Sequence, residues 1–269
     1  MMRRLLGIAV STLIILLFAA CGGAKDVATD DTDDHSPEPA EVTAEAGEQT
    51  GAYAAFPEGL PEEPEAARPQ METNLSDYPL SVVTDDLLVL VNKTHTLTRD
   101  YEADDLVTVE HCDPDVGNDN TKKMRKVAAD AVEELIAGAA EDGYSLVMRT
   151  GYRSYGYQEY LFNYWAEKDG EAAAENYSAR PGKSEHQTGL ACDIGRRGYG
   201  LSSFNDTAEA AWLAENCWKY GFILRFPADK TDITGYIYES WHIRYVGKEA
   251  AKIIYDEGLT LEEYLGILN

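Results

Sequence analysis

The chain has 269 residues, of which 44% are apolar, so it can bury one substantial core and still carry additional segments. Its formal net charge is −25, and Lys and Arg form no cluster beyond the extreme N-terminus. Because the phosphate backbone would repel such a chain, this composition excludes nucleic acid as a partner. We expect one folded domain that functions as a monomer, since no pattern in the sequence requires a partner surface.

The first twenty residues are typical of a bacterial secretory signal. Two arginines precede the apolar run Leu5–Ala20, which is too short for a stable membrane span. Small residues directly before Cys21 resemble a lipobox, where the signal is cut and the new N-terminal cysteine is acylated, although Phe18 replaces the usual aliphatic residue. We therefore expect a signal peptide over 1–20 and an extracytoplasmic lipoprotein anchored to the membrane through Cys21. The alternative is a plain signal peptide in which Cys21 has no role.

An acidic segment follows, over residues 21–77. Between Gly22 and Leu75 there are fourteen acidic residues against two basic ones, with very few Val, Ile or Leu. Such a composition cannot offset the entropy of ordering, and like charges keep the chain extended. We expect a flexible, disordered spacer that carries a folded domain over 78–269 away from the membrane, or else a simple solubilising tail.

The remaining sequence alternates short apolar runs with helical patterns. Leu87–Val91 is a strand candidate, and apolar positions spaced three and four residues apart predict a helix over about 121–140. Further predicted elements, in chain order, are a strand at 144–149, a helix at 155–168, a helix from Asp206 or Thr207 to Tyr220 closed by Gly221, a strand at 222–226, and helices at 248–256 and 261–268. This pattern predicts an α+β fold, a single domain with a small antiparallel sheet flanked by helices.

Three cysteines lie in the predicted domain: Cys112, Cys192 and Cys217. An exported protein can form disulfides, but an odd number of thiols cannot all pair within one chain. The pairing stays open from sequence, with Cys192–Cys217 as the first candidate. No C-x-x-C pair is present, which argues against a zinc site built from thiolates.

Candidate metal ligands are few. Of the five histidines, His35 falls in the spacer, whereas His186 stands shortly before Asp193 and His242 closes the sequence Glu239-Ser-Trp-His. A hydrolytic zinc ion needs imidazole and carboxylate ligands with one position left open. Each fragment alone is weak, because a single buried histidine is more often a hydrogen-bonded core residue.

A second group of polar residues falls at a predicted strand-to-helix turn, in Thr150-Gly-Tyr-Arg-Ser. There Arg153 could face a cleft. The alternative is that Ser154 only caps the helix and Arg153 lies at the surface.

Together these segments resemble the VanY-type D-alanyl-D-alanine carboxypeptidases, bacterial zinc peptidases that also include L,D-carboxypeptidases. The matching stretches are Gly151-Tyr-Arg-Ser-Tyr with Gln158, Ser184-Glu-His-Gln-Thr-Gly-Leu-Ala-Cys-Asp-Ile, and Glu239-Ser-Trp-His, within a similarity that runs from about Leu87 to Gly247. Departures at Thr98, Ala103 and Thr150 leave these stretches unchanged.

The resemblance implies a role for each matching residue. His186, Asp193 and His242 would hold one Zn²⁺ per chain. Glu239 would be the catalytic carboxylate and Arg153 the cation that polarises the substrate. Three further residues, Ser184, Gln158 and Tyr155, are candidates for substrate contact.

The implied reaction is removal of the C-terminal D-Ala from peptidoglycan stem peptides. The motifs do not decide the stereochemistry of the cleaved bond, so an L,D-carboxypeptidase acting on tetrapeptide stems stays open. So does a non-catalytic module that binds cell wall, although such a module has no need of Glu239. Arg153, Arg180 and Arg225 are equal candidates for binding the terminal carboxylate of the substrate.

Overall fold

The computed structural model describes residues 87–115 and 117–267. The predicted signal peptide, Cys21, the acidic spacer and the first residues of the predicted domain lie outside this described part. Within it, every helix is too short or too polar to cross a lipid bilayer.

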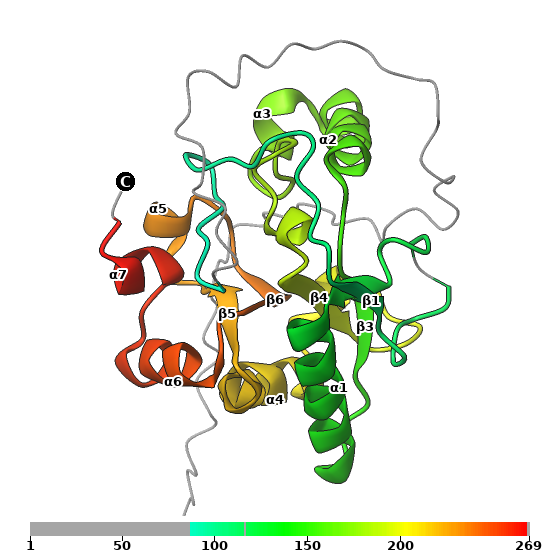
Figure 1. The fold of residues 1–269 in the computed structure, drawn as a ribbon, viewed down its shortest axis with the longest axis vertical. Helices are drawn as coiled ribbons and strands as arrows, with labels where there is room; N and C mark the ends of the chain where they lie inside the picture. Colours follow the sequence, from blue (N-terminus) through cyan, green and yellow to red (C-terminus); the bar gives the residue numbers. More distant parts are fainter. Residues whose placement is uncertain (1–86, 116, 268–269) are drawn as a thin grey trace, which may run out of the picture. The chain divides into compact units, whose positions relative to one another are not determined.

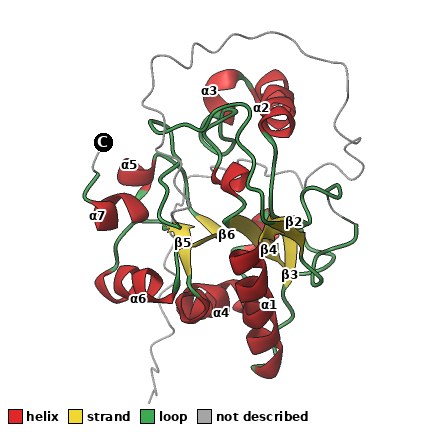
Figure 2. Cartoon of the chain, in the orientation of Figure 1, coloured by secondary structure: helices red, strands yellow, loops and turns green. Residues whose placement is uncertain are grey.

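A four-stranded antiparallel sheet lies at the centre of the described region. Its strands are β3 (Val147–Thr150), β4 (Ala191–Gly195), β6 (Glu239–Tyr245) and β5 (Phe222–Phe226), in that spatial order. The two inner strands, β4 and β6, are buried along their whole length. A separate two-stranded ladder joins β1 (Leu106–Thr108) to β2 (Lys123–Arg125). The predicted α+β class with a small antiparallel sheet is thereby confirmed (Figures 1 and 2).

The main core lies between this sheet and helix α1 (Lys126–Glu141). The apolar stripe of α1 includes Val132 and Leu135, which share one cluster with Met148 of β3, Cys192 of β4 and Ile243 of β6. Burial of such a stripe stabilises a helix far more than its intrinsic propensity does. In Figure 1, α1 lies on the same side of the sheet as α4 (Ala208–Asn216) and α6 (Lys248–Glu257).

A smaller apolar cluster holds the helices on the other side of the sheet in Figure 1, α2 (Tyr155–Asp169) and α3 (Glu171–Ala174). Phe162, Trp165 and Ala174 form its buried part. Ser154 caps α2 by accepting a hydrogen bond from the Tyr157 N–H, which is the capping role considered from sequence. The remaining short helices are α5 (Thr231–Thr234) and α7 (Leu261–Leu265).

The predicted elements differ from the observed ones mainly at their ends. The helix expected from residue 121 begins at Lys126, because the residues before it pair with β1. Thr207 caps α4 as predicted, but the α-helix ends at Asn216 and continues as the 3₁₀ turn η4 (Cys217–Tyr220). Gly221 then closes it with a φ of 87°, a conformation that favours glycine.

Two predictions were wrong. The segment Leu87–Val91 is buried only over its last three residues and forms no strand, because the carbonyls of Leu87 and Val89 accept hydrogen bonds from the guanidinium of Arg244 rather than from a neighbouring strand. The bridge between Cys192 and Cys217 is also absent, since all three cysteines of the described region are free. Both thiols lie in the apolar core, where burial raises the pKa of Cys217 to about 12 and that of Cys192 well above its ordinary value.

Candidate metal centre and active site

The candidate site is built where β4 and β6 pair. Asp193 of β4 is directly opposite His242 of β6 in the register of the sheet. Because side chains alternate along a strand, Cys192 faces the apolar core, as expected from sequence, while Asp193 faces away from it. His186 comes from the 3₁₀ turn η2 (Glu185–Thr188), which Gly189 reverses into β4 with a φ of 69°.

These three side chains converge on one oxygen. Asp193 Oδ1 lies 3.1 Å from His242 Nδ1 and 3.4 Å from His186 Nε2. One ligand atom from each residue falls within 4.8 Å of the others, and all three residues are buried. Among the residues that the structure describes, this is the group of side chains arranged to hold a metal ion.

The contacts behind the three side chains also suit a metal. His186 Nδ1 lies 2.7 Å from the carbonyl oxygen of Gly151, so Nδ1–H donates to it and the lone pair of Nε2 faces Asp193. Arg153 Nη2 donates to Asp193 Oδ2 at 2.7 Å, which leaves Oδ1 for the ion. Two imidazoles and one carboxylate form a donor set that suits hydrolytic zinc, and two of the three, His186 and Asp193, are oriented by a second hydrogen bond.

Electrostatics set the charge states of these groups. Burial alone would raise the pKa of Asp193, but His186 and Arg153 outweigh it and hold that pKa well below its usual range. Burial, with Arg153 adding to it and Asp193 opposing, lowers the pKa of His186 to about 4. Burial also disfavours protonation of His242, but Asp193 and Glu185 raise its pKa to about 9. At neutral pH the carboxylate and His186 are therefore in the state that a metal ligand needs, whereas His242 has to release a proton on binding.

Glu239 lies beside this centre, at the start of β6. Its Oε2 is 3.8 Å from His242 Nδ1, and the residue is only 6% exposed. Burial, helped by the nearby charge of Asp193 and opposed by His242 and Arg153, raises the pKa of Glu239 to about 8. A carboxyl group with such a pKa can both accept and donate a proton near neutral pH.

A cavity of about 100 Å³ opens onto these residues. Arg153, Ser184 and Glu239 line it together with the three candidate ligands. Its apolar walls include Leu161, Trp165, Tyr177, Phe226, Tyr236 and Trp241. The cavity thus combines charged side chains with aromatic walls, as expected for a site that binds a small peptide.

Other residues considered from sequence lie elsewhere. Tyr155 is buried and packs against Arg99, outside the cavity lining. Gln158 donates to the carbonyl of Ala179, a residue of the cavity wall, but does not line the cavity itself. Arg180 is paired with two glutamates of the α3 region, Glu171 and Glu175.

Two charged residues that sequence reasoning passed over do line the cavity. Lys183 and Glu185 flank Ser184, and both are buried. The signal available in the sequence was their position beside Ser184, in the stretch that leads to His186. Arg225, a third candidate for the substrate carboxylate, is fully buried and bound to Glu185, so it has no free edge for a peptide.

Comparisons with known proteins agree with this arrangement. The family described as VanY, D-alanyl-D-alanine carboxypeptidase, matches residues 121–248. A putative carboxypeptidase of Bacillus subtilis, YodJ, is 46% identical over 188 residues, which cover 67% of each chain. A D-alanyl-D-alanine carboxypeptidase of Enterococcus faecium is 35% identical over 186 residues, covering 67% of this chain and 58% of the relative.

Solved structures show the same likeness. The LdcB LD-carboxypeptidase, solved in a study of peptidoglycan recognition, is similar with a TM-score of 0.63 and 45% identity, covering 68% of this chain and 87% of that one. A D,D-pentapeptidase VanY from a VanB-type resistance cassette, solved in complex with Zn(II), has a TM-score of 0.55 and 36% identity, covering 66% and 98%.

Proposed function

Because this chain belongs to the VanY family of D-alanyl-D-alanine carboxypeptidases, we propose that it is a zinc-dependent enzyme that removes the C-terminal D-Ala from peptidoglycan stem peptides. One observation carries the proposal: Asp193 Oδ1 lies between two histidine nitrogens, with the carboxyl of Glu239 in the same cavity. A relative of known structure was solved with Zn(II), which supports the choice of metal.

The zinc ion would be held by His186 Nε2, Asp193 Oδ1 and His242 Nδ1. When bound, it would supply a Lewis acid that lowers the pKa of a water molecule and polarises the peptide carbonyl. Arg153 keeps Asp193 ionised through its 2.7 Å contact with Oδ2. We assign the same guanidinium, which also lines the cavity, to the negative charge that develops on the carbonyl oxygen.

Glu239 is the proposed proton carrier. As a general base it would take a proton from the attacking water, and as a general acid it would pass that proton to the departing amine of D-Ala. Burial raises the pKa of Glu239 to about 8 in the metal-free chain, and a zinc ion bound beside it would lower that pKa and favour the carboxylate that acts as the base. A module that only binds cell wall has no need of a buried carboxyl here, so we place that alternative last.

The second candidate is an L,D-carboxypeptidase that acts on tetrapeptide stems. It is favoured by the higher identity to LdcB, 45% against 36% for the VanY structure. Both reactions use the same metal centre, so the difference lies in the stem length and the configuration that the cavity accepts.

The test is release of the terminal residue from synthetic pentapeptide and tetrapeptide stems, with and without a chelator, alongside Glu239→Ala. We expect release that the chelator and the substitution both abolish, and the preferred stem then separates the two reactions. Zinc binding without release from either stem would refute the proposed function and favour the binding module.

We further propose that the chain is an exported lipoprotein and that the cleaved protein begins at Cys21. The support is the sequence of the first 21 residues, which lie outside the described structure. Mass spectrometry of the membrane fraction should find an acylated N-terminal cysteine, and Cys21→Ala should release the protein from the membrane. A protein that stays in the membrane fraction after this substitution would contradict the proposal.

A further inference from the structure

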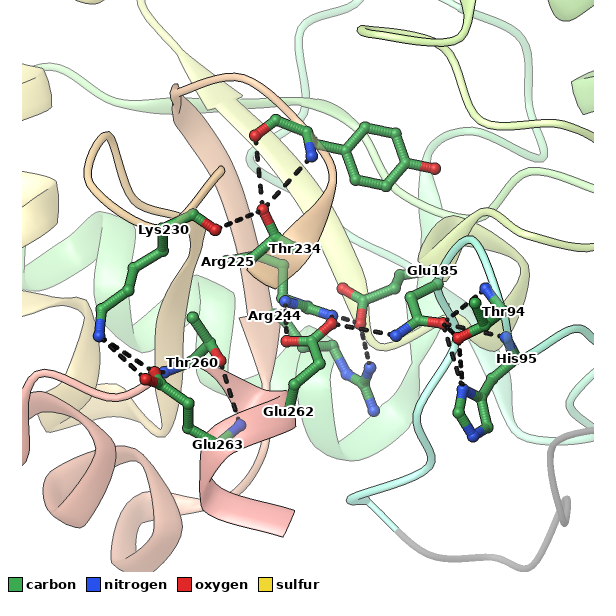
Figure 3. Close-up of polar contacts among 12 residues, drawn as sticks. Thr94, His95, Glu185, Arg225, Lys230, Thr234, Arg244, Thr260, Glu262 and Glu263 are labelled. Atoms are coloured by element: carbon green, nitrogen blue, oxygen red, sulfur yellow. Dashed lines mark hydrogen bonds and ion pairs between the residues drawn. The ribbon is translucent and has the colours of Figure 1, made fainter. Parts of the chain in front are cut away.

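Behind the metal centre lies a buried cluster of four charged side chains. Its members are Glu185, Arg225, Arg244 and Glu262, each at most 4% exposed (Figure 3). They come from four separate elements, η2, β5, β6 and α7. Two acids and two bases cancel in charge, so the cluster as a whole is neutral.

The cluster is closely connected. Arg225 Nε and Arg244 Nη1 both donate to Glu185 Oε1, at 2.9 Å and 2.8 Å. The other edge of Arg225 forms a bidentate pair with Glu262, at 2.6 Å and 2.9 Å. Such planar pairs fix orientation as well as charge.

Backbone and amide groups complete the cluster at its far side. Arg244 Nη2 donates to the carbonyls of Leu87 and Val89, and Asn92 Nδ2 donates to Glu262 Oε1. The family match covers residues 121–248. The cluster therefore also includes groups that lie outside this range, on the segment near residue 90 and on α7.

One atom of the cluster points at the metal centre. Glu185 Oε1 receives both arginines, whereas Oε2 is buried with no hydrogen-bond partner. His242 Nε2 is likewise buried without a hydrogen-bond partner. It lies 3.6 Å from Glu185 Oε2. A carboxylate oxygen that faces an imidazole nitrogen in this way favours a proton on Nε2, which leaves the Nδ1 lone pair directed at Asp193.

Stability alone is a poor explanation for this arrangement. Taking four charges out of water is costly, and apolar side chains of similar volume often stabilise a fold at least as well. The arrangement instead fixes the orientation of the Glu185 carboxylate. Both arginines bind its Oε1, so its Oε2 is held facing His242.

We propose that Glu185 is a positioning residue for the metal ligand His242 and that Arg225, Arg244 and Glu262 hold it in place. This inference rests on the proposed function, since the ligand role of His242 belongs to it. Helix α7 and the segment around residue 90 then belong to the working metal centre, although neither supplies a ligand.

The test compares zinc affinity, measured by competition with a fluorescent chelator on the metal-stripped full chain. Glu185→Gln keeps the shape of the side chain and removes its charge. We expect zinc to bind about 10- to 100-fold more weakly, as is typical when the partner of a ligating histidine is lost. Glu262→Gln, one step further from the metal, should give a smaller loss in the same direction.

Glu263→Gln is the matched control. Glu263 neighbours Glu262 on the same helix but pairs with Lys230 nearer the surface, so this substitution should leave zinc affinity unchanged. Wild-type zinc affinity in a folded Glu185→Gln variant would overturn the proposal.

A measurement on the unaltered chain gives a result even if the variants do not fold. In the zinc-loaded protein, ¹⁵N NMR should place the proton of His242 on Nε2, in slow exchange with water. An Nε2 proton that exchanges rapidly with water would overturn the proposal, whereas a proton on Nδ1 would contradict the ligand role of His242 itself, because a nitrogen that binds zinc carries no proton. If the wild-type chain releases no residue from either stem, the proposed function fails and the zinc comparison still stands. Unchanged zinc affinity with normal release refutes the positioning role alone.

Discussion

Replacing Glu239 with glutamine should stabilise the metal-free protein while it abolishes hydrolysis. Glu239 is 6% exposed and lies near the ionised Asp193, so its negative charge is unfavourable in the folded chain. Glutamine has nearly the same shape and carries no charge. The gain in stability should therefore depend on pH.

The sign and size follow from the pKa. In the folded protein the pKa of Glu239 is raised from 4.5 to about 8. Between these values the folded state holds a proton that the unfolded chain has lost, so the stability contributed by this group falls as pH rises towards 8. At 1.36 kcal/mol per pH unit, the loss reaches at most about 5 kcal/mol above pH 8. The Glu239→Gln variant does not show this loss of stability, because the amide does not titrate.

Urea unfolding of the metal-stripped wild-type chain and of Glu239→Gln, at several pH values from 5 to 9, measures the difference directly. The two free energies of unfolding should be similar near pH 5 and should diverge in favour of the variant as pH rises. Parallel pH profiles would refute the claim that this carboxyl is held in an unfavourable site.

Three further predictions concern the frame of the site and the core. Gly151→Ala should destabilise the fold by about 1–3 kcal/mol and lower the zinc content, because a Cβ there would lie 2.3 Å from the carbonyl oxygen of Lys123. Thermal unfolding measures the stability and metal analysis the zinc content, and an unchanged melting temperature would count against the prediction. Arg153→Met should lower kcat about 10²- to 10³-fold at saturating zinc, since one charge that stabilises the oxyanion is lost; steady-state kinetics would contradict this if only KM changed. Leu135→Ala, in the main core, should cost about 2–5 kcal/mol in urea unfolding without altering zinc affinity; a loss of zinc binding in the folded variant would show that the core and the site are coupled.

The sequence was informative where a pattern is local. Helix α1 follows from apolar residues spaced three and four apart, and the cap at Thr207 and the stop at Gly221 follow from the chemistry of those residues. The short run Leu87–Val91 was misassigned, because an apolar run of this length fits a strand and a buried irregular segment equally well. The carbonyls of Leu87 and Val89 bond to Arg244, a residue far along the chain whose position the local sequence does not reveal.

The candidate site shows the same division. Family motifs were enough to name His186, Asp193 and His242, which the fold brings together at the pairing of β4 and β6. The orientation of those ligands was not predictable from sequence. It depends on a backbone carbonyl at Gly151 and on Glu185, whose partners Arg225 and Arg244 come from the distant strands β5 and β6.

The most direct test of zinc-dependent hydrolysis is a zinc titration. The chain would be stripped with a chelator, zinc returned in measured amounts, and release of terminal D-Ala from a pentapeptide stem and a tetrapeptide stem followed at each step. We predict no release without metal and a linear rise that reaches a plateau at one zinc per chain. Release that persists in the stripped chain, or that zinc does not restore, would contradict the account.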